Sequence, residues 1–242
     1  MTRVGPLKRV LGVSSADSTR MRAARLVQAM RYRERPVLDY SRLRWYRETT
    51  TTYGVTAHSI VPTALRAFAR ISVTGLDNVP STGPIILAAN HLDNLDAYLL
   101  LHLVPRQVHF AARPDGFGTG TLCAIWRRLG AFPADAWGIR YGLSLLAENA
   151  AVGVFPQGTI SRDLVTKCGA AGVLALYSGA PVVPIAIRGT DDVHFTSILT
   201  HRVHVRVRFG IPVEFSRCRA GALRSRAVSD EILHHIQALL VD

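Results

Sequence analysis

The stretch PIILAANHLDNLDAYLLLHL, residues 84–103, contains an apolar run, a polar turn and a helical pattern in immediate succession. Residues 84–90 are nearly all apolar, as expected for a strand with both faces buried. Residues 94–103 then carry apolar side chains at the spacing of a helix. A buried strand that passes through a polar turn into a helix is the repeating unit of a parallel α/β sheet.

The same alternation of short apolar runs and helical patterns continues along the chain. We expect further strands at 108–112, 152–156 and 181–187, and helices at about 119–129, 139–149 and 168–178. Strands joined by helices predict an α/β fold with a mostly parallel central sheet flanked by helices.

The C-terminal part begins with a different strand pattern. Residues 202–209, RVHVRVRF, alternate apolar and basic side chains, which predicts a strand with one buried and one charged face. We interpret the arginines as a solvated face that blocks pairing at a sheet edge. A last helix from about 221 to 240 is expected to close the domain.

The N-terminal part is rich in arginine and has little regular patterning, apart from a helix candidate at about 18–30. We therefore divide the chain into a basic N-terminal extension, 1–55, and one domain, 56–242. At 59–71 the spacing predicts an amphipathic helix with Arg66 and Arg70 away from its apolar face. Packing on the core is the favoured role of this helix, and an interfacial position on anionic lipid is the alternative.

Charge limits the classes of partner. The 29 Lys and Arg against 17 Asp and Glu give the 242-residue chain a formal charge of +12, which favours anionic partners such as acidic lipid, coenzyme A or nucleic acid. The basic residues are dispersed and no nucleic-acid-binding motif is present, so we expect no nucleic-acid partner.

Cysteine spacing and hydropathy indicate the compartment. Cys123, Cys168 and Cys218 show neither CxxC nor Cys/His ligand spacing, so we expect reduced thiols and no metal site. The sequence has no signal-peptide core and no uninterrupted run of 18 apolar residues. We expect a cytoplasmic protein that, if it meets a membrane, is peripheral.

The polar turn of the opening stretch has a chemical interpretation. Ligands of open α/β sheets bind beyond the carboxyl ends of the strands, where His91 is expected. Asp96, in the first turn of the next helix, could accept a hydrogen bond from one imidazole nitrogen and leave the other as a base. The nucleophile would then be a hydroxyl of the substrate. In the structural alternative, Asn90, Asp93 and Asp96 only cap the helix and His91 is a turn residue.

Two further segments have the same strand-to-loop arrangement. In FPQGTISRD, residues 155–163, a strand is followed by a Pro/Gly turn whose backbone amides could cradle a phosphate or an oxyanion. In KCGAAGVLALYSGAPVVPIAIRGT, residues 167–190, a small-residue helix leads through a glycine turn to a strand that ends at Arg188.

From about Val73 to Pro212 the sequence resembles the glycerophosphate and lysophospholipid acyltransferase family. NHLDNLD fits the family block NHxxxxD, FPQGTIS resembles FPEGTRS, and VVPIAIRGT resembles VPVAIxGT. LGAFPAD, residues 129–135, is similar to a short block that usually ends in arginine. Four blocks in the family order imply a glycerol-3-phosphate acyltransferase-like single domain and acyl transfer.

The resemblance implies a mechanism without a cofactor. His91, oriented by Asp96, would take the proton of an acceptor hydroxyl, which attacks the thioester of an acyl-CoA or acyl carrier protein. Alternatives are Ser161 or a cysteine as nucleophile, and a non-catalytic homologue that binds lipid or acyl carrier protein. The resemblance assigns substrate-binding roles to Asn90, Phe155, Pro156, Gln157, Gly158, Thr159, Lys167 and Arg188.

Departures from the family blocks leave the acceptor open. Gln157 and Ile160 stand where the family has Glu and Arg, and Ala136 follows the block that usually ends in Arg. Loss of arginines weakens a phosphate clamp. The acceptor is therefore a lysophospholipid or an amphiphile without phosphate, such as a glycolipid or secondary metabolite, and we expect peripheral contact with the inner face of an anionic membrane. Basic residues that could compensate are Arg140, Arg162, Lys167 and Arg188.

Overall fold

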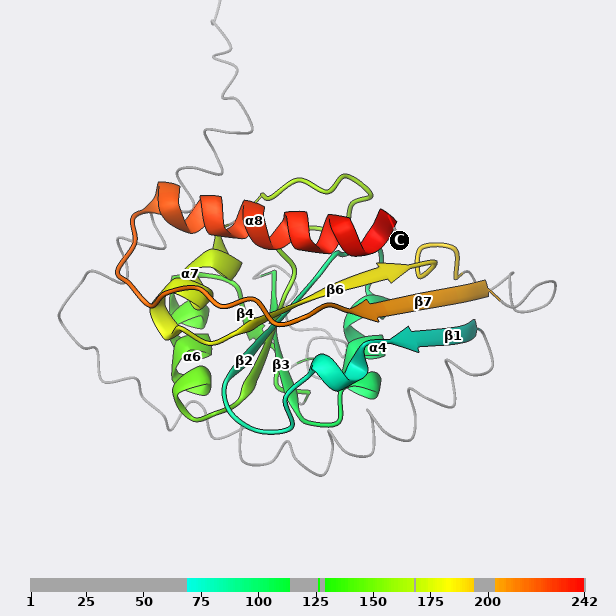
Figure 1. Cartoon of the computed structure of the whole chain (residues 1–242), viewed down its shortest axis with the longest axis horizontal. Coiled ribbons are helices and arrows are strands. Elements are labelled where there is room, and N and C mark those ends of the chain that lie inside the picture. The colour runs from blue at the N-terminus through cyan, green and yellow to red at the C-terminus, as the bar shows by residue number, and fades with distance from the viewer. Residues whose placement is uncertain (1–68, 114–125, 127–128, 168, 194–202, 242) are drawn as a thin grey trace, which may run out of the picture.

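A computed structural model describes residues 69–113, 126, 129–167, 169–193 and 203–241. These residues form a seven-stranded sheet in the order β1-β7-β6-β2-β5-β3-β4 (Figure 1). The strands are β1 (Ala69–Thr74), β2 (Ile85–Ala89), β3 (Val108–Ala112), β4 (Phe132–Pro133), β5 (Ala151–Val154), β6 (Val182–Arg188) and β7 (Val203–Phe209). The helices are the 3-10 helix η3 (Leu76–Asn78) and the α-helices α4 (Leu95–Leu103), α6 (Ala136–Ala147), α7 (Ala170–Ser178) and α8 (Ala222–Val241).

The sheet is mostly parallel, as the alternating sequence pattern predicts. Strands β6, β2, β5, β3 and β4 run in one direction, β7 is antiparallel to β6, and β1 is parallel to β7. The carboxyl ends of the parallel strands therefore meet at one edge of the sheet, where loops lead into α4, α6 and α7. Such an edge is the usual place for a ligand in an open α/β sheet.

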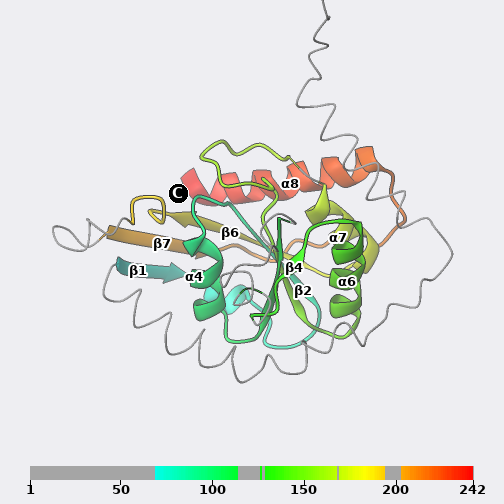
Figure 2. The ribbon, with the colours of Figure 1, turned by 180° about the vertical axis from the view of Figure 1, so that it is seen from behind.

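Both faces of the central strands are covered, which explains their nearly continuous apolar sequence. In β2, Ile85 and Leu87 join the core under α4, whereas Ile86 and Ala88 join the core under α6, α7 and α8. Figure 1 shows α8 along the upper side of the molecule, above β6, and Figure 2 shows α4 from the other side.

A small residue sets the contact between α7 and α8. A Cβ placed on Gly172 would lie 1.9 Å from the carbonyl oxygen of Ser225, so only glycine allows this approach. The Gly172 N–H donates to Ser229 Oγ at 2.8 Å. The helix-to-helix contact thus combines close backbone packing with a buried hydrogen bond.

The sequence predicts most of these elements to within three residues of their bounds. The strands expected at 84–90, 108–112, 152–156, 181–187 and 202–209 are confirmed, and so are the helices expected at 94–103, 139–149, 168–178 and 221–240. Strands β1 and β4 were not expected. The helix candidate at 18–30, most of 119–129, the boundary at residue 55, and Cys123 and Cys168 lie outside the described residues.

Two expectations are corrected. The helix expected at 59–71 is wrong at its end, because residues 69–71 belong to β1, and its remaining part lies outside the described residues. The alternation of buried and exposed residues in β7 is confirmed, but β7 is not an edge strand. It pairs with β1 on one side and β6 on the other, so its arginines do not block pairing. Within the described ranges, no helix combines the length and apolar character needed to cross a bilayer.

Candidate active site

The predicted contact between His91 and Asp96 is present at the carboxyl end of β2. His91 Nδ1 lies 2.9 Å from Asp96 Oδ2, and Asp96 is in the first turn of α4. A carboxylate can only accept a hydrogen bond, so Nδ1 carries the proton and Nε2 is left as the acceptor. The Asp96 side chain is completely buried, whereas the His91 side chain is 16% exposed. The imidazole is therefore both oriented from within the protein and reachable from solvent.

Asp96 is held by four hydrogen-bond donors. Besides His91, its Oδ2 accepts from the backbone N–H groups of Leu92, at 2.6 Å, and Asp93, at 2.9 Å. Its Oδ1 accepts from Thr190 Oγ1 at 2.5 Å. Such a set of partners offsets the cost of burying a carboxylate. Helix capping, the structural alternative considered from sequence, is wrong for Asp96, because its two backbone donors lie in the turn before α4. Only Asp93 accepts from a residue of the helix, the Leu95 N–H at 2.8 Å.

Thr190 is the site residue that sequence reasoning missed. It lies just beyond β6, after Gly189, whose φ of +83° is in the left-handed region. The threonine was inside the quoted block VVPIAIRGT, but only its arginine was selected. Because β6 pairs with β2, the residues that follow the two strands meet, and this adjacency could have indicated Thr190.

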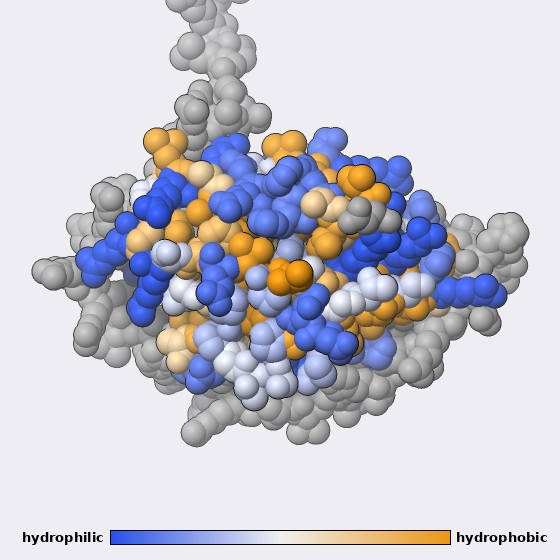
Figure 3. Space-filling model, in the orientation of Figure 1, coloured by the Kyte–Doolittle hydropathy of each residue, from blue (hydrophilic) through white to orange (hydrophobic). Residues whose placement is uncertain are grey.

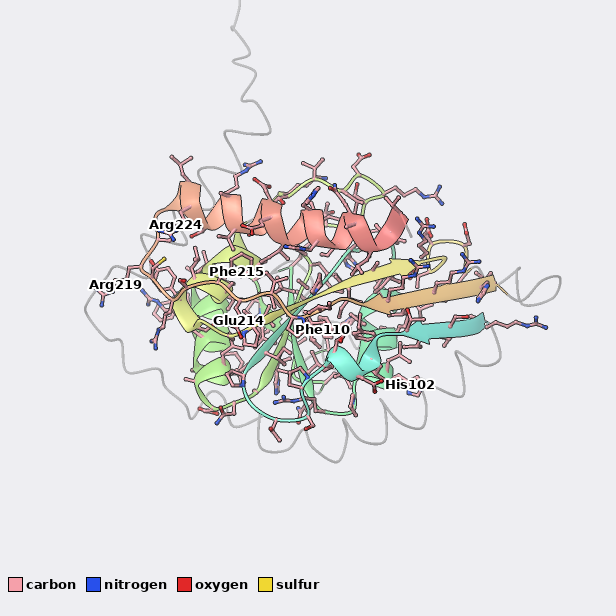
Figure 4. The ribbon with its side chains drawn as sticks, in the orientation of Figure 1. His102, Phe110, Glu214, Phe215, Arg219 and Arg224 are labelled. Atoms are coloured by element: carbon pink, nitrogen blue, oxygen red, sulfur yellow. The ribbon has the colours of Figure 1, made fainter. Side chains whose placement is uncertain are left out.

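Stacked aromatic rings support the imidazole. Phe155 stacks on His91 with ring centroids 4.0 Å apart and an interplanar angle of 12°. Phe110, labelled near the middle of the sheet in Figure 4, stacks on Phe155 at 5.5 Å. Gly153 makes room for this arrangement, because a Cβ there would lie 2.3 Å from the Phe110 ring. Phe155, predicted to bind substrate, therefore holds the ring of His91 from below.

Gln157 joins the two loops that form the site. Its Oε1 accepts from the His91 backbone N–H at 2.6 Å, and its Nε2 donates to the carbonyl oxygens of Ser161, at 2.6 Å, and Asp163, at 3.0 Å. The Ser161 N–H donates back to the His91 carbonyl at 2.9 Å. The Gln157 side chain is fully buried, so it positions His91 through the backbone.

Asn90 has a similar positioning role. Its Nδ2 donates to the Ile187 carbonyl at 2.8 Å, and its Oδ1 accepts from the Ile187 N–H at 2.7 Å. These bonds extend the pairing of β2 and β6 by one residue. Asn90 is buried with both amide groups occupied, so it acts on a substrate only through the placement of His91.

The expected cradle of backbone amides is wrong for three amides of the loop after β5. The Gly158 N–H donates to the Phe155 carbonyl, the Ser161 N–H to His91, and the Asp163 N–H to Ser161 Oγ. Gly158 has a φ of +66°, which shapes the turn. The other residues predicted to bind substrate in this turn are Pro156, which is buried, and Thr159, which is half-buried.

The basic side chains that sequence placed near the site have separate environments. Arg162 Nη2 lies 2.7 Å from Asp191 Oδ2, and this pair of an exposed arginine and a half-buried aspartate links the loops after β5 and β6. The Arg140 guanidinium lies 5.2 Å from the ring centroid of Trp137. In the described part of the chain, neither contacts His91 or Asp96.

Lys167 and Arg188, the two basic residues predicted to bind substrate, are both exposed. Arg188 lines a hollow together with Arg206, Arg208 and side chains at the end of α8. The structure therefore places Arg188 among other arginines. In the described ranges, Arg188 makes no contact with the His91–Asp96 pair.

Comparison with known proteins finds similarity to acyltransferases. Residues 70–188 match the family model described as Acyltransferase. The chain is 30% identical over 129 residues to the 1-acyl-sn-glycerol-3-phosphate acyltransferase of Bacillus subtilis (strain 168), which covers 50% of this chain and 64% of that protein. It is 30% identical over 163 residues to a chloroplastic 1-acyl-sn-glycerol-3-phosphate acyltransferase of Arabidopsis thaliana, which covers 62% of this chain and 45% of that protein. The chain thus spans less than two thirds of the length of these relatives.

A solved structure has the same fold. The crystal structure of the 1-acyl-sn-glycerophosphate acyltransferase PlsC from Thermotoga maritima superposes with a TM-score of 0.60 at 21% sequence identity. The match covers 90% of this chain and 87% of that one. At this identity the comparison concerns the fold, and it agrees with the single α/β domain expected from sequence.

Proposed function

Since this chain carries an acyltransferase domain of the glycerophosphate acyltransferase family, we propose that it is an O-acyltransferase with His91 as its general base. The observation that carries the proposal is the His91–Asp96 contact at the ligand-binding edge of the sheet. The contact fixes the tautomer that leaves Nε2 free to accept a proton.

The reaction proceeds without a covalent enzyme intermediate. His91 Nε2 takes the proton from the acceptor hydroxyl as its oxygen attacks the thioester carbonyl carbon. A carbon–oxygen bond forms, the carbon–sulfur bond breaks, and the proton on Nε2 passes to the departing thiolate. The Asp96 carboxylate stabilises the imidazolium that exists between these steps. Acyl-CoA or an acyl carrier protein is the donor, and no cofactor takes part.

The first acceptor to consider is a lysophospholipid, because the relatives are named for 1-acyl-sn-glycerol 3-phosphate. Lys167 is the exposed cation that the proposal assigns to its phosphate. An acceptor without phosphate is the second candidate. It is favoured by Ile160, which is 43% exposed where the family has arginine, and by Ala136.

The intact His91–Asp96 pair weighs against a non-catalytic protein that only binds lipid or acyl carrier protein. A carboxylate with no exposure and four donors, aimed at one imidazole nitrogen, is an arrangement that binding alone does not require. We also propose that the protein lies in the cytoplasm and contacts the inner face of an anionic membrane peripherally.

The test identifies the acylated products and measures how far turnover depends on His91. The protein is incubated with mixed acyl-CoAs and a panel of lysophosphatidate, other lysolipids and alcohols without phosphate, and products are identified by mass spectrometry. We expect one preferred acylated acceptor. His91→Ala should lower turnover by about two to four orders of magnitude, the range for general-base catalysis. His234→Ala, which removes an exposed histidine of α8, is the matched control and should leave turnover unchanged.

Asp96→Asn should do less harm than His91→Ala. The amide oxygen can accept from His91 and the two backbone N–H groups, while the amide nitrogen donates to Thr190 Oγ1, which can accept instead of donating. Near-normal turnover by a well-folded His91→Ala protein would refute the assigned base. The absence of any acylated product would refute the acyltransferase itself.

A further inference from the structure

One face of the sheet between β1 and β6 carries four arginines and a histidine. Alternate residues of these strands point to the same side, and Arg70, Arg188, His204, Arg206 and Arg208 share the side opposite the buried Val205 and Val207. We call these five residues the basic sheet face. All are exposed except Arg208, which is half-buried.

The strand register brings the basic side chains close together. Arg70 lies opposite His204 across β1 and β7, and His204 Nε2 lies 2.6 Å from Ser72 Oγ. Arg188 lies opposite Arg206 across β6 and β7, and like charges directly opposite each other destabilise a strand pair. In the described ranges, no carboxylate forms an ion pair with Arg70, Arg188 or Arg206. An anionic partner would relieve this repulsion.

Apolar side chains border the basic sheet face. Leu239 and Leu240, near the end of α8, line the hollow formed with Arg188, Arg206 and Arg208. Arg208 Nη1 donates to the Leu239 carbonyl at 3.4 Å, which fixes this contact, and Val241 at the tip of α8 is 85% exposed. Figure 3 shows strongly hydrophilic residues over β6 and β7 beside apolar ones. Cations beside exposed apolar side chains suit the boundary between phosphate headgroups and acyl chains.

The basic sheet face also lies near the His91–Asp96 pair. Arg188 is the last residue of β6, and Thr190, two positions further on, donates to Asp96. A surface that binds this face therefore lies beside the end of the sheet that carries His91.

We propose that the basic sheet face docks the protein on an anionic phospholipid surface, with lipid phosphates between the arginines and the end of α8 against the acyl boundary. This docking gives the proposed acyltransferase access to a membrane-borne acceptor, so its purpose rests on the proposed function. The docking itself is measured without turnover.

The test compares two double charge reversals in the full chain. Arg70→Glu with Arg206→Glu alters the basic sheet face, and Arg219→Glu with Arg224→Glu alters exposed arginines at the opposite end of the molecule (Figure 4). Each pair lowers the formal charge from +12 by the same four units. Partitioning is measured by co-sedimentation with vesicles of phosphatidylglycerol and phosphatidylcholine, and with vesicles of phosphatidylcholine alone.

The basic-face variant should bind the anionic vesicles at least about thirtyfold more weakly than the wild type. This is the loss of two basic contacts of about 1 kcal/mol each, converted at 1.4 kcal/mol per tenfold change. The control variant should bind with less than about a threefold loss, because its arginines lie away from the docked face.

Equal losses in both variants would show that net charge alone governs binding, and unchanged binding by the basic-face variant would show that this face is not the contact. Either result overturns the proposal. Retained vesicle binding with lost binding to purified acyl carrier protein would also overturn it, in favour of an acidic protein partner. Turnover of a short-chain, water-soluble acceptor is measured in parallel, so that failure of acyl transfer is recognised separately from failure of docking.

Discussion

At the scale of single residues, Gln157 shows how a family position can change its role. From sequence, Gln157 was noted only as a residue without the charge of the glutamate that the family block has at this position. In the structure the Gln157 amide is buried and its Nε2 donates to two carbonyl oxygens. A carboxylate has no hydrogen to donate there.

We therefore predict that Gln157→Glu destabilises the protein by about 2–4 kcal/mol at pH 8, because two hydrogen bonds are lost and a buried charge faces the carbonyls of Ser161 and Asp163. The loss should be smaller at pH 5, where a protonated carboxyl regains one donor. Urea unfolding at both pH values measures the difference. Wild-type stability at pH 8 would contradict the bonding described for this side chain.

The residues around His91 differ from it in role, because they hold its backbone or its ring in place. His91 is the side chain of the site with access to solvent and an acceptor nitrogen, whereas Asn90, Phe155 and Gln157 fix its backbone or its ring. Thr190 acts one step further away, through Asp96. The family blocks thus mark many residues that position His91, the proposed base.

At the scale of elements, the contact between α7 and α8 depends on one missing methyl group. Gly172→Ala would put a Cβ 1.9 Å from the Ser225 carbonyl oxygen, and neither backbone can move without shifting a helix. We predict a loss of about 1–3 kcal/mol, the usual cost of overpacking, although alanine favours the helix intrinsically.

Urea unfolding measures this loss, with Gly221→Ala as the matched control. A Cβ on Gly221 meets nothing within 4 Å, so that substitution should cost less than about 1 kcal/mol. Equal stability of the two variants would mean that α7 and α8 can separate at little cost.

Strand pairing explains the error made for β7. Its charged face resembled the solvated face of an edge strand, but β1 covers that edge by pairing in parallel register with it. The first strand of the sheet was hidden because its apolar residues follow directly on a helical pattern. The arginines of β7 are thereby joined to those of β1 and β6 in one surface.

At the scale of the whole molecule, a buried histidine links stability to pH. Burial lowers the pKa of His109, and its hydrogen bond with the Gly130 carbonyl opposes this shift to a smaller extent. The folded state therefore binds a proton less readily than the unfolded state, whose histidine has a pKa of about 6.5. Stability contributed by neutral His109 is present above pH 6.5 and is lost as the pH falls from there toward the lower folded pKa.

We predict that His109→Gln flattens the dependence of stability on pH between 7.5 and 5.5, because glutamine can donate to Gly130 but does not titrate. The difference in slope is at most about 1.4 kcal/mol per pH unit. Urea midpoints at constant ionic strength measure it, and His234→Gln, at an exposed position of α8, should keep the wild-type slope. A wild-type slope in His109→Gln would show that protonation of this histidine is not coupled to unfolding.

The sequence alone determined the class of fold and the centre of the site. The short apolar runs at 84–90, 108–112, 152–156 and 181–187 are typical of interior strands, and all four contain strands of the sheet. The five-residue spacing of His91 and Asp96 allowed them to meet across one turn. Local patterns of this kind follow the periodicity of strands and helices, which can be recognised from the spacing of apolar residues along the sequence.

Only the tertiary structure decided which distant residues meet. The bond from Thr190 to Asp96, the amide of Gln157 between two loops, and the stack of Phe110, Phe155 and His91 all depend on the strand order β6-β2-β5-β3. The basic sheet face likewise depends on β1 pairing with β7, across more than a hundred residues of chain. Strand order is set by how whole faces bury one another, and no local spacing encodes it.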